Sequence, residues 1–385
     1  MVTAAPARPP ADGLRAARVL PRLPRPDSPF GAAAFWSWLV LFATVVSLAC
    51  CQPRHSSPSA AMPAYQTDKF RLSAGPCAVD GYPATILEGR FLNALGGGFP
   101  VPYGHTLDGN WGRSGIGWAV GEEQQAVPDS LELRWFSYTE DKFYEGHFLL
   151  PQQRLHALLQ QGYWNAEEKK HETYQSFTVC VAPTGAAYVW LAGTNTVFVG
   201  RYQAREIQFD FKEFIPMADR AQVVKEGRES LPPQVKREIA AGTVGTKQWD
   251  AYLKTYPWRV AFSQPLVLTD FAVGYRNAEE MAAPLTANLA PYLQHVLAPS
   301  SKPVPKDAVF YLSGAYGRKA LFRVSLFDEA ETMAAFRVLH AQHPTEPLTL
   351  FIDTDERLGK VALSLRAGGQ VIPLAKSPVQ IVPLP

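Results

Sequence analysis

The chain lacks an excess of charge of either sign. Its 385 residues carry a formal net charge of +2, and residues 1–49 hold five Arg and two Asp, a balance of +3 that leaves −1 for the remainder. A basic surface for nucleic acid is therefore not predicted. Apolar residues are not scarce, because they make up 47% of the chain, enough to bury a substantial core. We expect a folded protein with one large or two ordinary domains.

Phosphate-binding and nucleophile motifs are also lacking. Segment 95–127 contains nine Gly but no Lys-Ser/Thr ending of a P-loop, and its Gly-x-Gly-x-x-x-Gly spacing from Gly115 misses the dinucleotide pattern by one residue. Around Ser114 the second Gly falls one position too early for a nucleophile elbow. We interpret the segment as a long loop. Its Trp111 and Trp118 either hold the loop on the core or stack on a ligand such as a sugar ring.

Candidate metal and acid–base residues occur only in small groups. The groups are His340 with His343 near the end of an expected helix, Glu145 with His147, and Asp353, Asp355 and Glu356 at an expected hairpin turn. Zinc needs three or four ligands, and Asp is a common turn residue. We therefore predict no catalytic, cofactor-binding or metal-binding residue and no cofactor. Whether the protein is an enzyme stays open, and the balance favours a non-enzymatic protein.

The N-terminus contains the most informative pattern. Residues 1–30 contain five Arg and seven Pro, a composition that disfavours helix and strand and that stays on the cytoplasmic side of a membrane. From Phe30 to Pro53 no residue is charged. About 20 apolar residues would span roughly 30 Å as a helix, so length alone permits a permanent membrane anchor.

The end of the apolar run favours cleavage and lipid attachment. Ser47-Leu48-Ala49-Cys50 and Leu48-Ala49-Cys50-Cys51 both resemble a lipobox, in which a cysteine receives a diacylglyceryl group before the signal peptide is cut. Either Cys50 or Cys51 is the predicted lipidation site. An uncleaved anchor and ordinary secretion are the alternatives. The residue after the lipidated cysteine is Cys or Gln rather than Asp, so we expect the outer membrane, with the protein facing the periplasm.

Four regions follow from these patterns. Residues 1–50 form the basic segment and signal or anchor, and residues 51–66, rich in Pro, Ser and Ala, form a flexible tether. Residues 67–260 are expected to form a β-rich domain and residues 261–385 a smaller C-terminal α+β domain. Only Cys77 and Cys180 remain in the folded part. In an oxidising periplasm they could form a disulfide, or Cys180 could be a buried apolar residue with Cys77 free.

Alternation of apolar and polar residues predicts mainly strands. In segment 131–137, Leu131, Leu133 and Trp135 alternate with Glu132 and Arg134, and segments 187–193 and 196–211 are rich in β-branched and aromatic residues. Helices are predicted after Pro151, ending at Gly162, and in two pieces over 230–258. The fold class is α+β, β-rich, with an antiparallel sheet and a few short helices.

The C-terminal region has its own pattern. Asn277 with Glu280 resembles a capping box, and segment 300–307 resembles a linker. Strands are predicted over 308–313 and 320–327, a helix from Asp328, and further strands over 347–353, 359–366 and 370–375. This β-β-α-β-β order is the predicted second α+β domain.

Several residues of segment 67–260 resemble a bacterial family. They are Trp135-x-Ser137-x-x-Glu140 followed by Tyr144, Ala182-Pro183-x-Gly185 followed by Val189-Trp190-Leu191, and Tyr256-Pro257-Trp258. The pattern is similar to the domain of unknown function 2931 family, whose members are typically predicted lipoproteins. Thr184 stands where the family pattern has Gly. The resemblance implies no catalytic residue, and we interpret these residues as determinants of the fold, with Trp190 packed beside Trp135.

The function predicted from the sequence is that of an uncharacterised cell-envelope lipoprotein. It would be a non-enzymatic binding module for a periplasmic protein or glycan, attached to the membrane through an N-terminal lipid or helix. One alternative is an immunity-type inhibitor of a secreted effector. Another is an envelope hydrolase that uses Glu145, His147 or the acidic turn at Asp353.

Overall fold

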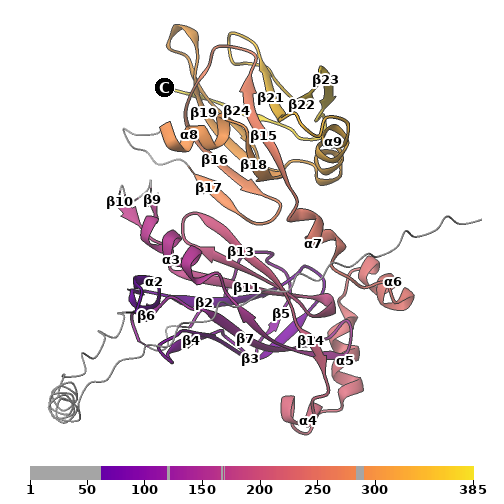
Figure 1. Ribbon diagram of the computed structural model, residues 1–385. Helices are drawn as coiled ribbons and strands as arrows, with labels where there is room; N and C mark the ends of the chain where they lie inside the picture. Colours follow the sequence, from indigo (N-terminus) through magenta and orange to yellow (C-terminus); the bar gives the residue numbers. More distant parts are fainter. Residues whose placement is uncertain (1–61, 119–121, 166–167, 169, 283–289) are drawn as a thin grey trace, which may run out of the picture. The chain divides into compact units, whose positions relative to one another are not determined.

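The computed structural model describes residues 62–118, 122–165, 168, 170–282 and 290–385 (Figure 1). The predicted anchor Phe35–Pro53 and both candidate lipidation residues, Cys50 and Cys51, lie outside these ranges. Within the described ranges, no helix combines the length and the apolar character needed to cross a membrane.

The predicted β-rich α+β fold class is confirmed. A six-stranded sheet has the order β14-β8-β7-β3-β4, with β5 also paired to β3. Its strands are β3 (Ala84–Leu92), β4 (Gly98–Pro100), β5 (Thr106–Leu107), β7 (Ser130–Ser137), β8 (Lys142–Leu149) and β14 (Arg205–Ile207). All of the pairings within this sheet are antiparallel.

A second, nine-stranded sheet has the order β2-β11-β12-β13-β17-β16-β19-β20-β24. Its first strands are β2 (Ser73–Ala78), β11 (Ser176–Ala182), β12 (Ala186–Ala192) and β13 (Thr196–Gln203). Its remaining strands are β16 (Val267–Tyr275), β17 (Glu280–Ala282), β19 (Pro305–Ser313), β20 (Lys319–Val324) and β24 (Gln380–Leu384). One residue pair, Thr196 with Glu280, connects the two groups of strands.

The main core lies between the six-stranded sheet and strands β2 and β11–β13 (Figure 1). Leu131, Leu133 and Trp135 of β7 are fully buried in it, as their alternation with polar residues predicts. Phe177 and Val179 of β11 lie in the same core. Helix α3 (Gln152–Gln161) begins after Pro151 and ends at Gly162, also as predicted.

Trp190 does not pack beside Trp135, so that prediction is wrong. Strand β12 is buried on both faces: Val189 and Leu191 face the main core, whereas Tyr188 and Trp190 face a separate cluster on the other side. There the Trp190 indole donates a hydrogen bond to the Asn277 carbonyl at 2.8 Å. The prediction assumed that only one face of the strand is buried, so that every buried side chain would lie in the same core. Because β12 is covered on both faces, its buried side chains lie in two different clusters.

Helices surround the first two sheets at several points. They are α2 (Ala64–Thr67), α4 (Phe211–Phe214), α5 (Arg220–Glu229), α6 (Pro233–Ala241) and α7 (Lys247–Tyr252). The predicted helical pieces of 230–258 correspond to α6 and α7, and Gly242 ends α6 in the left-handed conformation. Two short antiparallel pairs complete this part: β1 (Lys69–Phe70) with β6 (Gln125–Ala126), and β9 (Tyr163–Asn165) with β10 (Lys170–Glu172).

A third sheet, of five strands, has the order β18-β15-β21-β22-β23. It contains β15 (Thr255–Phe262), β18 (Ser300–Pro303), β21 (Leu348–Thr354), β22 (Val361–Ala367) and β23 (Gln370–Pro373). Helices α8 (Ala290–Leu297) and α9 (Glu329–Gln342) pack with it, and the cluster that includes them begins at Tyr256. Asp328 caps α9 by accepting the Glu331 N–H at 2.8 Å.

Two local predictions in this region are wrong. Asn277 does not start a helix: its side chain accepts the Glu279 N–H in a turn before β17. Segment 300–307 is not a linker, because it contains β18 and the start of β19. The side chain of Lys302, in this segment, is only 1% exposed. The polar composition of the segment therefore did not predict its burial, which depends on the residues packed around it.

Candidate functional site

The outer face of the six-stranded sheet contains a grid of charged side chains. Along β7 the side chains alternate, so Glu132 and Arg134 point away from the core that buries Leu133. Glu88 lies beside Arg134 on β3, and Glu145 lies beside it on β8. The positions are set by strand register, because each of these residues is a direct cross-strand neighbour of the next.

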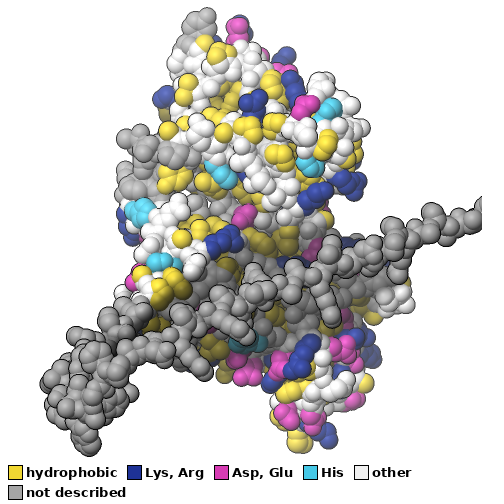
Figure 2. Space-filling model, in the orientation of Figure 1, with side chains coloured by type: hydrophobic (Ala, Val, Ile, Leu, Met, Phe, Trp, Pro, Cys, Tyr) yellow, Lys and Arg dark blue, Asp and Glu magenta, His cyan; other side chains and the backbone are white. Residues whose placement is uncertain are grey.

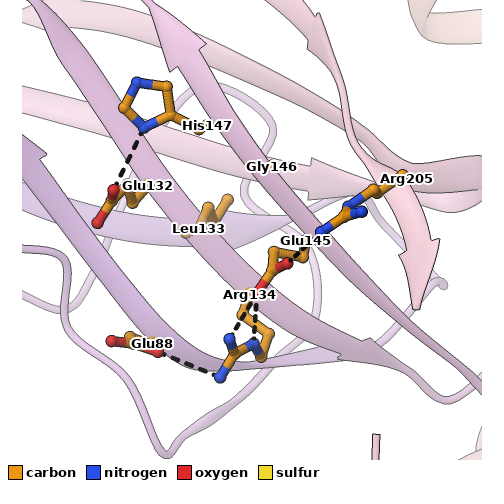
Figure 3. Close-up of a pocket in the computed structure, with 8 residues that line it drawn as sticks. All are labelled: Glu88, Glu132, Leu133, Arg134, Glu145, Gly146, His147 and Arg205. Atoms are coloured by element: carbon orange, nitrogen blue, oxygen red, sulfur yellow. Dashed lines mark hydrogen bonds and ion pairs between the residues drawn. The ribbon is translucent and has the colours of Figure 1, made fainter. Parts of the chain in front are cut away.

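One row of the grid is a continuous ladder of ion pairs across four strands (Figure 3). Arg134 binds Glu88 through Nη1 at 3.3 Å and Glu145 through Nε at 3.0 Å. Arg205 of β14 binds the second oxygen of Glu145 at 3.0 Å. Hydrogen bonds from Arg134 and then Arg205 lower the pKa of Glu145, so this carboxylate stays ionised at neutral pH.

The neighbouring row has the opposite order of signs. Arg90 on β3 is the cross-strand partner of Glu132, and His147 on β8 lies on the other side of Glu132 with its Nδ1 at 3.3 Å from a carboxylate oxygen. Along each strand, and across the strands, acidic positions therefore alternate with basic ones. We call this set the charge grid; it consists of Glu88, Arg90, Glu132, Arg134, Glu145, His147 and Arg205.

Two adjoining cavities lie over the charge grid. One, of about 390 Å³, is the cavity of Figure 3 and lies over β7, β8 and Arg205. The other, of about 800 Å³, extends over β3 toward α4. Glu88 and Arg134 line both cavities, so the two adjoin, and we call them together the groove. Each volume is within the range of about 300–1,000 Å³ that is usual for ligand sites.

Aromatic residues line the larger cavity. Tyr103 is 48% exposed, and the Trp118 ring packs edge-on against it at 4.9 Å between centroids. Phe209 and Phe214 line the side near α4. Segment 95–127 is not one long loop, because it contains β4, β5 and β6. Trp118, expected either to hold the loop on the core or to stack on a ligand, contacts Tyr103, which lines the larger cavity. Trp111, in contrast, packs against Trp190 and donates to the Arg276 carbonyl at 2.9 Å.

An apolar cluster ends the groove at α4 and α5. Phe136 and Phe143 of the sheet pack against Phe211 of α4 and Val224 of α5. Arg220 lies over three of these rings and forms an ion pair with Asp141 at 2.7 Å. This part of the outer face is covered, and the charge grid is the part that α4 and α5 leave open.

The candidate acid–base pair does not form. Glu145 is bound by two arginines, and His147 lies against Glu132 instead. Of the acidic turn, Asp355 accepts the N–H groups of Gly359 and Lys360, the role of an ordinary turn residue. Glu145 and His147 therefore do not pair with each other, which acid–base catalysis by that pair would need. The carboxylate that lies within reach of the His147 imidazole is that of Glu132, with Nδ1 at 3.3 Å from its oxygen.

The histidines of α9 are buried in part by neighbouring rings. His340 packs edge-on against Tyr256 at 5.3 Å, and the His343 ring lies against Gly368. Throughout the described ranges, no group of three His, Cys, Asp or Glu residues is placed to hold a metal ion.

Cys77 and Cys180 are brought together as two buried free thiols. They occupy paired positions on the parallel strands β2 and β11. Burial, and then a hydrogen bond with Cys77, raise the pKa of the Cys180 thiol, so the thiolate that starts disulfide exchange is disfavoured in the folded state. The disulfide stays a prediction.

Some of the residues that carry the family resemblance meet around the carboxylate of Glu140. Glu140 accepts the Tyr144 hydroxyl at 2.9 Å, the Ser137 hydroxyl at 3.1 Å and the backbone N–H of Thr184 at 3.0 Å. The Tyr144 ring also occupies the space next to Gly185, where a Cβ would approach it to 2.8 Å. These contacts connect turns of the two sheets, which supports the interpretation of these residues as determinants of the fold.

Most grid residues carry no signal in the sequence beyond the alternation within their own strand. Glu88, Arg90 and Arg205 were not candidates, because only the pairing of β3, β7, β8 and β14 places them side by side. An exposed charged residue at every second position of a strand was the available signal, and it is typical of any solvated sheet face.

Comparison with known proteins gives one match, to a protein family. No curated protein and no solved structure matches the chain. Residues 55–246 match a protein family, and this range contains every residue of the groove. Tyr256-Pro257-Trp258 and the five-stranded sheet follow the matched range. Through residues 55–246, the chain belongs to the family described as protein of unknown function, DUF2931.

Proposed function

We propose that this protein is a non-enzymatic binding module of the cell envelope, and that the groove on the outer face of the six-stranded sheet holds its partner, a periplasmic protein or a glycan. The observation that carries the proposal is the charge grid, an open sheet face with side chains held in place by one another. Side chains that are ordered before binding lose less conformational entropy when a partner arrives.

Features of the same face favour binding over hydrolysis. Glu145 is held ionised by two arginines, so it is a poor proton donor at neutral pH. His147 is exposed and faces Glu132, not a buried nucleophile. The groove therefore has fixed donors and acceptors for recognition, and its candidate acid and base, Glu145 and His147, are each bound to a different partner.

Attachment to the membrane is part of the proposal. Lipidation at Cys50 or Cys51 would place the folded part on the periplasmic side, tethered by residues 51–66. The mass of the N-terminal peptide from membrane-extracted protein tests this, with Cys50→Ser and Cys51→Ser as comparisons. A peptide that begins at either cysteine and carries acyl chains supports the anchor. An unmodified peptide that retains residues 35–49 contradicts it.

Site-specific crosslinking in native cells tests the binding role. A photoreactive amino acid replaces Arg90 or His147 in the groove, or Val371 of β23 as a control that is also exposed. An adduct from the groove positions and not from position 371 supports a partner at this face. The same adducts from all three positions, or no adduct from any of them, would contradict the proposal. A secreted effector as the adduct would make the protein an immunity-type inhibitor.

A further inference from the structure

The balance of charge in the groove limits the kind of partner. On the sheet floor, three glutamates (88, 132 and 145) alternate with three arginines (90, 134 and 205). A polyanion would meet the glutamates and a polycation the arginines, so each would be opposed by half of the floor. Around α4 and α5, acidic and basic side chains also lie side by side on the visible surface (Figure 2). Net charge therefore attracts neither kind of polymer.

Edge pairing with a peptide is blocked on the β3 side of the groove. The backbone of β3 is already paired with β4 and β5, and between them the Gly89 and Ile86 carbonyls accept the N–H groups of Val101 and Gly104, both at 2.9 Å. On this side of the sheet an extended peptide would find no free strand edge for its own N–H and C=O groups. A partner that binds through hydroxyl groups does not depend on such backbone pairing.

A sugar hydroxyl both donates and accepts hydrogen bonds, like a Ser or Thr hydroxyl. Carboxylates accept and guanidinium groups donate, and the charge grid presents the two in alternation. The ion pairs hold these groups in position: Arg134 and Glu145 are only 30% and 29% exposed. Tyr103, which lines the same groove, is half exposed and packs edge-on against Trp118, and an exposed aromatic ring suits the apolar face of a pyranose ring.

We infer that the groove binds an uncharged glycan, built of neutral hexose or N-acetylhexosamine units, with one ring on Tyr103 and hydroxyl groups on Glu88, Arg134 and Glu145. The inference rests on the proposed function and names the chemistry of the partner. Because the ligand is uncharged and the floor is balanced, binding depends little on ionic strength.

Calorimetric titration of the full-length, detergent-extracted protein tests the inference. The probes are the N-acetylglucosamine tetramer, the β-1,4-linked glucose tetramer and a peptide of alternating Lys and Glu. We expect one of the tetramers to bind, with affinities at about 0.02 M and 0.5 M NaCl that agree within about twofold. Tyr103→Ala should weaken the binding about tenfold, whereas Tyr103→Phe, which keeps the ring, should retain it.

The possible outcomes separate the inference from the proposed function. If neither tetramer binds while the peptide binds, or while crosslinked adducts still form from positions 90 and 147, the glycan inference is wrong and the binding role stands. If no probe binds and no groove-specific adduct forms, both are wrong. Tetramer binding that survives Tyr103→Ala unchanged also overturns the inference. Unchanged thermal unfolding of Tyr103→Ala shows that a loss of binding is local.

Discussion

The carboxylate of Glu140 binds the backbone N–H of Thr184, with both oxygens at 3.0 Å. Glu140 follows β7 at the turn to β8, and Thr184 lies in the turn from β11 to β12, so one side chain connects the two sheets of the main core. Thr184 has a φ of +58° and a ψ of +22°, the left-handed region. This explains why the family pattern has Gly there: Gly adopts this conformation without steric cost.

Replacing Glu140 should destabilise the fold. In Glu140→Ala, the Tyr144 hydroxyl and the Thr184 N–H lose their acceptor, and we expect the free energy of unfolding to fall by about 1–3 kcal/mol. Urea denaturation of the purified protein measures it. Glu132→Ala, at an exposed position of the same sheet, is the control and should change stability by less than about 0.5 kcal/mol. Equal losses in the two variants would contradict the role of Glu140.

Thr184→Gly should stabilise the protein. A non-Gly residue in the left-handed region costs about 1–2 kcal/mol, and part of that is offset by the greater freedom of Gly in the unfolded chain. We expect a gain of up to about 1 kcal/mol and a higher melting temperature. Thr349→Gly, in the extended backbone of β21, should have the opposite sign, since Gly weakens a strand. A loss of stability in both variants would sink this explanation.

Cys77 and Cys180 should be found as a disulfide in protein taken from an oxidising periplasm. Neighbouring strands lie about 4.7–4.9 Å apart, within the Cα separations of about 4.4–6.8 Å that disulfides need, and the two residues are direct strand partners. Closing this loop of about 100 residues stabilises by up to about 4–5 kcal/mol. Alkylation after unfolding without reductant, followed by mass spectrometry, gives the answer. Two labelled thiols would show that the pair remains reduced.

Stability should decrease in mild acid through His295. Burial, and then the charge of Lys302, lower the pKa of His295 to about 4, while its ordinary value is near 6.5. Above pH of about 6.5 the imidazole is neutral in both states and its contribution is complete. Between pH of about 6.5 and 4, His295 binds a proton in the unfolded chain but not in the folded one. The free energy of unfolding therefore decreases as the pH is lowered through this range, by up to about 3 kcal/mol.

Urea denaturation between pH 7 and 4 measures this dependence. His295→Gln should remove part of the slope, although the variant also changes the contact of His295 with the Tyr275 hydroxyl at 3.1 Å. Gln294→Ala, at an exposed position of the same helix that carries no ionisable group, should leave the slope as in the unmodified protein. A slope that is identical in all three proteins would assign the acid sensitivity to other groups.

Local patterns were sufficient for most of the secondary structure. The alternation of Leu131, Leu133 and Trp135 with polar residues predicted β7 and its buried face, because side chains of a strand point to opposite sides. Pro151 and Gly162 predicted the ends of α3, and Asp328 predicted the start of α9. These residue types favour helix termini through backbone conformation and hydrogen bonds within a single turn, so the sequence alone reveals them.

Other features depended on partners far away in the sequence. Lys302 belongs to a segment with the composition of a linker, yet its ammonium group is buried and donates to the carbonyls of Trp258 and His295 and to the Ser300 hydroxyl. Its environment comes from β15 and α8, which no local pattern connects to it. Trp190 faces a second cluster for the same reason, because distant residues such as Trp111 and Asn277 and the helices α6 and α7 cover the far side of its strand.

The sequence by itself determined elements such as β7, α3 and α9 and the apolar side of β7, because these depend on periodicity and on chemistry within a few residues. Only the tertiary structure decided that Glu88, Arg134, Glu145 and Arg205 form one ladder. They come from four strands spread over more than a hundred residues, and strand order and register are set by packing across the whole sheet. The groove exists because this strand register places the four side chains next to one another.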